Sequence, residues 1–232
     1  MKERAFTPRK REQGGYWTAV KSVTNFSIKF GWNNRVVRLI IIGTLVQSMF
    51  MMWGFYGWQP YLLDMLGRRD AAWISGFIAA GVAFSTAIGN GLVPLVRKIA
   101  KRRSLILAGS AVLMALASLG MGLANSFAPA LIALIAMMIA AGAAMPVKQA
   151  FLHSKTPSEQ RATVISFDAL VGSGGGAVGQ TGLGWVARQY GLSVGYMIGG
   201  IILALSAPVY LFLTRRKDED DIIAETQHAP KA

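Results

Sequence analysis

The charged residues of this 232-residue chain are separated by uncharged runs longer than a soluble fold usually contains. The long runs cover residues 39–63, 71–96, 104–147, 162–187 (interrupted only by Asp168) and 189–214. A helix needs about 20 residues to cross the hydrocarbon core of a bilayer. Because lipid cannot satisfy the polar edge of an open sheet, each run is expected to be a membrane-spanning helix.

The run at 104–147 has 44 residues and is long enough for two spans. Its centre reads Asn-Ser-Phe-Ala-Pro at 125–129, and these residue types favour a turn. The predicted fold is therefore an all-α integral membrane protein with six transmembrane helices. The spans are expected at about 39–63, 71–96, 104–124, 127–147, 162–187 and 190–214, between a basic segment at 1–35 and a tail at 215–232.

Basic residues are unevenly divided between the two sides of these six spans. Of the 24 Lys and Arg residues, 21 fall on the side that holds both termini and 3 fall on the other. Positive residues favour the cytoplasmic side, so the pattern predicts a multi-pass protein of the plasma (inner) membrane with both termini in the cytoplasm. The net charge of +13 then indicates contact with anionic lipid of the inner leaflet, and no nucleic-acid partner is expected.

The segments outside the spans give three further expectations. Residues 16–32 fit either a short helix on the inner membrane surface or an unstructured linker. Thr156 and Glu159, with Pro157 between them, predict a capping box that starts the fifth helix. The tail is expected to be a positive anchor at 215–217 followed by a disordered acidic end at 218–221.

Several segments together resemble a known family. They read KERAFTPRK before the first span, WGFYGWQPYL within it, GNGLVPLVRKIAKRRSL after the second and PSEQRATVISF at the start of the fifth. This order resembles the C-terminal six-helix half of a major facilitator superfamily (MFS) transporter, with 1–35 as part of its central loop. The resemblance implies secondary transport of a small organic solute.

In that family the solute lies between two six-helix halves, and this sequence supplies one. The resemblance therefore implies a partner, either an N-terminal six-helix half or a second copy of this chain. A truncated, non-transporting fragment or a structural membrane subunit is the main alternative. An intramembrane enzyme is a remote one, because the chain has no cysteine and its two histidines, His153 and His228, show no metal-site spacing. No catalytic residue, metal or cofactor is expected.

The loop between the second and third spans resembles the family's glycine-plus-basic signature. It has Gly91 followed by the basic residues Arg97, Lys98, Lys101, Arg102 and Arg103. It differs from the family pattern because no aspartate is present in this loop. The resemblance alone therefore does not predict the charge relay that is ascribed to this signature.

The resemblance also implies that the first, second, fourth and fifth spans face the central cavity and that the third and sixth face lipid. Polar and aromatic residues are concentrated in the proposed cavity helices. The candidates for the cavity wall are Gln47, Met51, Phe55, Trp58, Gln59, Asn90, Gln149 and Gln180. The aromatic residues also fit an interfacial belt. Neutral amides, Met and aromatic rings favour a lipophilic or neutral solute over a strongly charged one.

Asp168 is the only acidic residue within a span. It lies seven residues after Arg161, roughly 10 Å along a helix, and so belongs to the inner leaflet. Two roles are open: a structural ion pair with Lys148 or Arg161, or a proton-coupling site.

The fifth span also contains closely spaced glycines at Gly172, Gly175, Gly176 and Gly179. No GKS or GKT follows them and they lie inside a span, which argues against a phosphate loop or another ligand site. Their spacing instead favours close helix packing or local bending.

Overall fold

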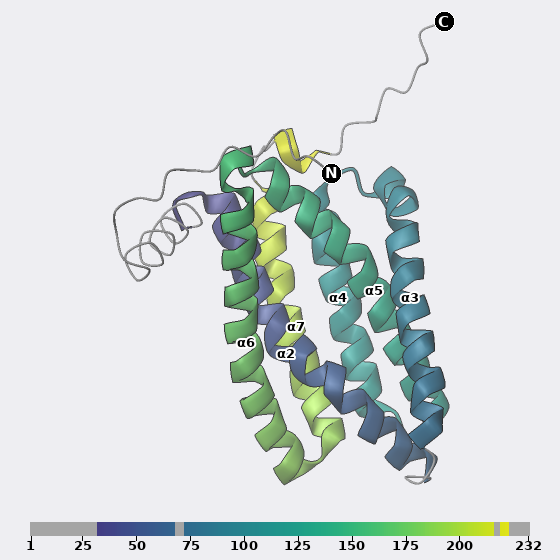
Figure 1. The fold of residues 1–232 in the computed structure, drawn as a ribbon. Helices are drawn as coiled ribbons and strands as arrows, with labels where there is room; N and C mark the ends of the chain where they lie inside the picture. Colours follow the sequence, from purple (N-terminus) through teal and green to yellow (C-terminus); the bar gives the residue numbers. More distant parts are fainter. Residues whose placement is uncertain (1–31, 68–71, 216–218, 223–232) are drawn as a thin grey trace, which may run out of the picture.

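The computed structural model describes residues 32–67, 72–215 and 219–222. The long helices pack into one bundle (Figure 1). They are α2 (Arg35–Leu66), α3 (Ala72–Ile99), α4 (Arg103–Leu123), α5 (Phe127–Ser154), α6 (Arg161–Tyr190) and α7 (Leu192–Thr214), with short 3-10 turns η1 (Ser158–Gln160) and η2 (Glu219–Asp221). α4 and α5 share the uncharged run at 104–147, each of the other long helices covers one run, and α5 continues past the expected end at 147. The segment at 16–32 lies outside the described residues apart from Trp32.

Five of the described helices, α2, α3, α4, α5 and α7, are long and apolar enough to cross a membrane. The 30-residue α6 is less apolar because it carries many glycines and several polar side chains. It nevertheless spans the height of the bundle and packs against α2, which crosses the bundle diagonally (Figure 1). Across the described ranges, the chain forms helices and no strand.

The helices follow a spatial order that differs from their order in the sequence. α4 packs most extensively against α7 and then α5, while α3 packs mainly on α5 and α2 packs on α6 and α7. As a result α3 and α6 lie at the two edges of the bundle (Figure 1). The expectation that the third span faces lipid stays a prediction, and one side of α4 offers an apolar surface for it, with the exposed large residues Leu105, Val112, Leu113, Leu116 and Leu123. The other side of α4 is buried in the bundle.

An aromatic cluster joins α2 to α7 in the core. Tyr196 is fully buried, and its ring centroid lies 5.9 Å from Phe50, 5.1 Å from Trp53 and 5.0 Å from Tyr61. Aromatic pairs at these separations add stabilisation beyond the area they bury. The rings reach α7 because Gly199 leaves space there: a Cβ at this position would lie 2.1 Å from a ring carbon of Phe50.

Glycines on α6 allow a similarly close approach to α2. A Cβ at Gly175 would lie 2.5 Å from the carbonyl oxygen of Leu45, and one at Gly179 would lie 1.7 Å from that of Met49. Both distances are far below any real Cβ contact, so α6 can occupy this position only because these residues are glycines. The glycine run of the fifth span thus lies at a helix–helix contact.

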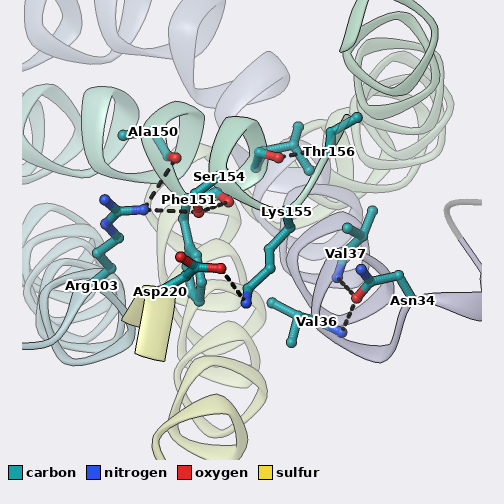
Figure 2. A network of polar contacts seen from close by, with 11 residues as sticks. Asn34, Val36, Val37, Arg103, Ala150, Phe151, Ser154, Lys155, Thr156 and Asp220 are labelled. Atoms are coloured by element: carbon teal, nitrogen blue, oxygen red, sulfur yellow. Dashed lines mark hydrogen bonds and ion pairs between the residues drawn. The ribbon is translucent and has the colours of Figure 1, made fainter. Parts of the chain in front are cut away.

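The starts of α2 and α4, the end of α5 and the tail lie at the end of the bundle that carries Arg97–Arg103, which we call the basic end (Figure 1). Figure 2 shows the Asn34 side chain accepting hydrogen bonds from the backbone N–H of Val36 (3.0 Å) and Val37 (3.3 Å), which caps α2. It also shows Arg103 donating to the Ala150 carbonyl (3.2 Å) and the Ser154 hydroxyl (3.0 Å). The second contact set joins the start of α4 to the end of α5.

The predicted capping box is wrong. The Thr156 hydroxyl donates to the Leu152 carbonyl at 2.8 Å, so it completes the last turn of α5 (Figure 2). Threonine hydroxyls readily donate to the carbonyl four residues earlier, and here Thr156 makes that bond in place of capping the next helix. The 3-10 turn η1 then leads into α6, which begins at Arg161 without a side-chain cap.

The expectation of a disordered acidic end is also wrong for the described part of the tail. Asp220 pairs with Lys155 at 2.7 Å (Figure 2). Asp221 is only 1% exposed, and its carboxylate accepts hydrogen bonds from the backbone N–H (2.8 Å) and the hydroxyl (2.6 Å) of Ser104. Arg102 occupies the N-cap position of α4 but provides no side-chain cap. A carboxylate is favoured at such a helix N-terminus, where backbone N–H groups lack acceptors. The composition of the tail does not predict that Asp221 binds there.

We expect Asp221→Ala to lower the free energy of unfolding by about 2 kcal/mol, because it leaves buried donors at the start of α4 without an acceptor. The measurement is unfolding of the purified chain in mixed detergent, followed by tryptophan fluorescence. Asp220→Ala is the matched control. Its carboxylate is half exposed, and an exposed ion pair is worth at most about 1 kcal/mol. Equal losses for the two variants would contradict the capping role.

Candidate functional site

An open cleft lies where α2 and α6 meet the C-terminal part of α5. Its volume is about 580 Å³, within the range of sites that take small organic molecules. The lining residues are Thr44, Ser48, Met51, Met52, Phe55 and Tyr56 of α2, Lys148 of α5, and Asp168, Ala169, Gly172 and Ser173 of α6. The spacings along α2 and α6 are those of one helical face, so each helix presents a continuous strip to the cleft.

A three-residue polar cluster lies in the wall of this cleft. The Lys148 ammonium is 2.9 Å from Oδ2 of Asp168 and donates to the Thr44 hydroxyl oxygen at 3.0 Å. The Thr44 hydroxyl in turn donates to Oδ1 of Asp168 at 2.6 Å. The cluster therefore joins α2, α5 and α6. Charges at this depth are expensive unless they are paired and hydrogen-bonded, and here each charge has both kinds of partner.

Of the two predicted partners of Asp168, the structure brings Lys148 to it and leaves Arg161 apart. Arg161 is exposed at the first position of α6, and within the described ranges its guanidinium makes no ion pair. The reason is the helix path: Asp168 lies two turns into α6, where α5 passes close enough for the lysine side chain to reach. Whether this pair is structural or couples transport to protons stays a prediction.

The predicted cavity residues are divided among several surroundings. Met51 and Phe55 line the cleft. Gln47 instead donates to the Ser206 hydroxyl of α7 at 3.4 Å, and Trp58 is 8% exposed within the core. Successive residues of a helix turn by about 100°, which places Gln47 and Trp58 just beyond one border of the strip that faces the cleft.

The remaining predicted cavity residues are exposed but do not line the cleft. They are Gln59, Asn90, Gln149 and Gln180. Trp58 does border a second void, between α2, α3 and α5, of about 10 Å³, which has room for about one water. That void is too small for a solute.

Thr44 and Ser48 are cleft residues that the sequence reasoning missed. A hydroxyl inside a helix is inconspicuous, because it can bond the carbonyl of the preceding turn. The available signal is their helical spacing with Met51 and Phe55, which places all four on one face.

The five basic residues of the predicted loop signature lie at the end of α3, in the turn that follows and at the start of α4, and they have different surroundings. Arg97, Lys98 and Lys101 are exposed at the basic end. Arg102 donates to the Thr214 carbonyl at the end of α7 at 2.6 Å, and it forms a backbone bridge with Ile222. The aspartate missing from the loop has a counterpart in space, because Asp221 of the tail reaches the start of α4 beside this loop.

These features define an all-α integral membrane protein with a solute-sized cleft and a paired charge in its wall. The family model described as Major Facilitator Superfamily matches residues 92–232, more than half of the chain. The chain belongs to this superfamily of membrane transporters. No curated protein sequence matches it. The matched range covers α4 to α7 and the end of α3, and so includes Lys148 and Asp168 but not the α2 side of the cleft.

Proposed function

We propose that this chain is one half of a secondary transport unit that moves a small organic solute across the plasma membrane, with the cleft as one wall of the solute site. The observation that carries the proposal is the cleft itself, which has solute size and places a paired charge beside apolar and aromatic side chains. In the superfamily, two six-helix halves move against each other around such a site.

A covering half would also account for the side chains exposed at this cleft. Phe55 and Tyr56 are 60% and 61% exposed, and Ser173 is exposed on the opposite wall. A polar group left in lipid without a partner costs on the order of 1–3 kcal/mol, so the exposed amide of Gln180, further along the same face of α6, favours a protein or aqueous surface on that face. The covering half is an N-terminal six-helix half or a second copy of this chain.

The proposal predicts association through the cleft face. A single cysteine in place of Ser173 should give a disulfide-linked dimer in mild detergent, or a linked heterodimer when a six-helix partner with its own cysteine is coexpressed. Leu116→Cys, on the exposed side of α4, is the control and should not crosslink. Mass measurement on the cysteine-free parent should give a mass above the 24.9 kDa of one chain. A stable monomer without crosslinks would favour a non-transporting membrane fragment instead.

The proposed orientation predicts a labelling pattern that intact cells can test. The natural sequence has no cysteine, so single cysteines need no background removal. Cysteines in place of Ala100 and Ser158, at the basic end, should react with an impermeant maleimide only after permeabilisation, because basic loops stay in the cytoplasm. A cysteine in place of Gly67, between α2 and α3, should react in intact cells. Labelling of the Ala100 variant in intact cells would reverse the orientation.

A further inference from the structure

We propose that the solute of this cleft carries a single acidic head group that binds Lys148, while its apolar or aromatic body lies on Met52, Phe55 and Tyr56. The inference rests on the proposed function, since it names the chemical class of the solute. It departs from the neutral solute that the amide residues indicated. Those amides lie outside the cleft lining, whereas Lys148 belongs to it.

Lys148 has a donor available for a ligand. An ammonium group has three N–H donors. Two of them reach Asp168 and Thr44, and the described residues offer no acceptor for the third. The Lys148 side chain is 20% exposed and lines the cleft, so the third donor is open to an incoming acceptor. An acid head group would gain a charge-assisted hydrogen bond there, which is among the stronger contacts a site can offer.

Asp168 is less suited to binding a cationic solute. Both of its carboxylate oxygens already accept a bond, one from Thr44 and one from Lys148, and its side chain is 12% exposed. A cation would also approach the ammonium of Lys148. An acid head group, in contrast, can take the third donor of Lys148 while Asp168 keeps its bonds to Lys148 and Thr44.

The remaining lining limits the solute to one acidic group. Lys148 and Asp168 are the only charged residues among the residues that line the cleft. A second acidic group on the solute would therefore find no cation. The rest of the wall offers two methionines and the rings of Phe55 and Tyr56, which stand edge to face with centroids 5.4 Å apart. Methionine and aromatic surfaces accept apolar bodies of varied shape.

An anionic lipid presents the same chemistry as a free organic acid. Lys148 lies six residues before the end of α5 at Ser154, about 9 Å along the helix, so a lipid head group at that boundary could reach it. The chemistry common to both sources is one acidic head on an apolar body, and the experiment must separate the two.

The experiment uses the purified full chain in an uncharged detergent and three probes with the same body: phenylacetate, phenylacetamide and phenethylamine. Binding is measured by titration calorimetry. We expect phenylacetate to bind about tenfold or more tightly than the amide and the amine, the factor that one charge-assisted hydrogen bond provides. Lys148→Met should remove this preference, and Lys148→Arg should retain it. Lys155→Met removes a lysine that pairs with Asp220 away from the cleft, so it should change nothing.

Asp168→Asn gives the sharpest readout, because a structural role alone would not improve binding. It removes the charge that competes for Lys148, so the folded fraction should bind phenylacetate several-fold more tightly. Equal binding of the acid and the amide, weakened alike by Tyr56→Ala, would overturn the acidic head group and leave the solute cleft standing. Tightest binding of phenethylamine would likewise overturn the acidic head group and leave the solute cleft standing. No binding of any probe would overturn both the inference and the cleft.

Nanodiscs separate the two sources of the acidic head. In phosphatidylcholine discs, Lys148-dependent phenylacetate binding supports a free organic acid. In discs that also contain phosphatidylglycerol, native mass spectrometry reports retained lipid. Phosphatidylglycerol that stays on the parent, leaves the Lys148→Met variant and displaces phenylacetate supports the acidic head and assigns it to a lipid.

Discussion

Replacing Gly179 by alanine is expected to push α6 away from α2 and to lower the free energy of unfolding by on the order of 3 kcal/mol, the upper end of ordinary overpacking. The added Cβ would lie 1.7 Å from the Met49 carbonyl oxygen, which belongs to backbone and cannot rotate aside. Because α2 and α6 form both walls of the cleft, separation should also weaken any ligand that binds there. Unfolding in mixed detergent and the yield of monodisperse protein measure the effect.

Gly174→Ala is the matched control for this prediction. It lies on the same helix, and a Cβ there would meet nothing within 4 Å. Alanine favours a helix over glycine by up to about 1 kcal/mol, so this variant should be neutral or slightly more stable. If Gly179→Ala unfolds no more easily than Gly174→Ala, the close contact between α2 and α6 is not present in the protein.

The helices were predictable from the sequence because charge is costly in lipid. The run from residue 71 to 96 has no charge, and α3 occupies Ala72–Ile99. The helix ends were less predictable. α5 continues through Pro146 and Lys148 to Ser154, since Lys148 finds an ion-pair partner and does not have to lie beyond the membrane. Local capping rules failed at Thr156 for a related reason, because the hydroxyl had a competing acceptor.

The candidate site was predictable in part. Asp168 stood out because it is the only acid in a span, and Lys148 because it lies close to the inner boundary. Thr44 did not stand out, although it bonds both. The predicted cavity side of α2 is rotated by a fraction of a turn from the side that lines the cleft. Met51, at the border of the lining strip, was therefore predicted correctly, whereas Gln47 and Trp58 were not. Helical periodicity gives the residues of a face but not its direction in the bundle.

The docked tail shows a different limit. Asp220 and Asp221 are ordinary members of an acidic stretch in the sequence, and composition predicts disorder for such a stretch. Their order depends on partners more than 60 residues away, Lys155 and Ser104. No local pattern identifies an acceptor that completes a distant helix N-terminus. An acid absent from the basic loop was the one available hint that another segment supplies it.

The ion pair between Lys148 and Asp168 gives the second large expected effect. Removing one member leaves the other charge without its partner, which costs about 3 kcal/mol at a largely buried site. Lys148→Met should cost more than Asp168→Asn, because the Asp168 side chain is the more enclosed one, at 12% against 20% exposed. An unpaired lysine can extend toward the head groups, whereas an aspartate of that length cannot.

The double variant Lys148→Met, Asp168→Asn should then lose less stability than the two single losses combined, since no unpaired charge remains. Unfolding in mixed detergent of all four proteins completes the cycle. Additive losses would show that the two side chains do not interact in the membrane.

If Asp168→Asn leaves stability unchanged but abolishes pH-dependent uptake by a reconstituted complete transporter, the residue couples protons to transport. The two roles are separable because a structural pair affects the free energy of unfolding at every pH at which both groups are charged, whereas a coupling carboxylate affects uptake.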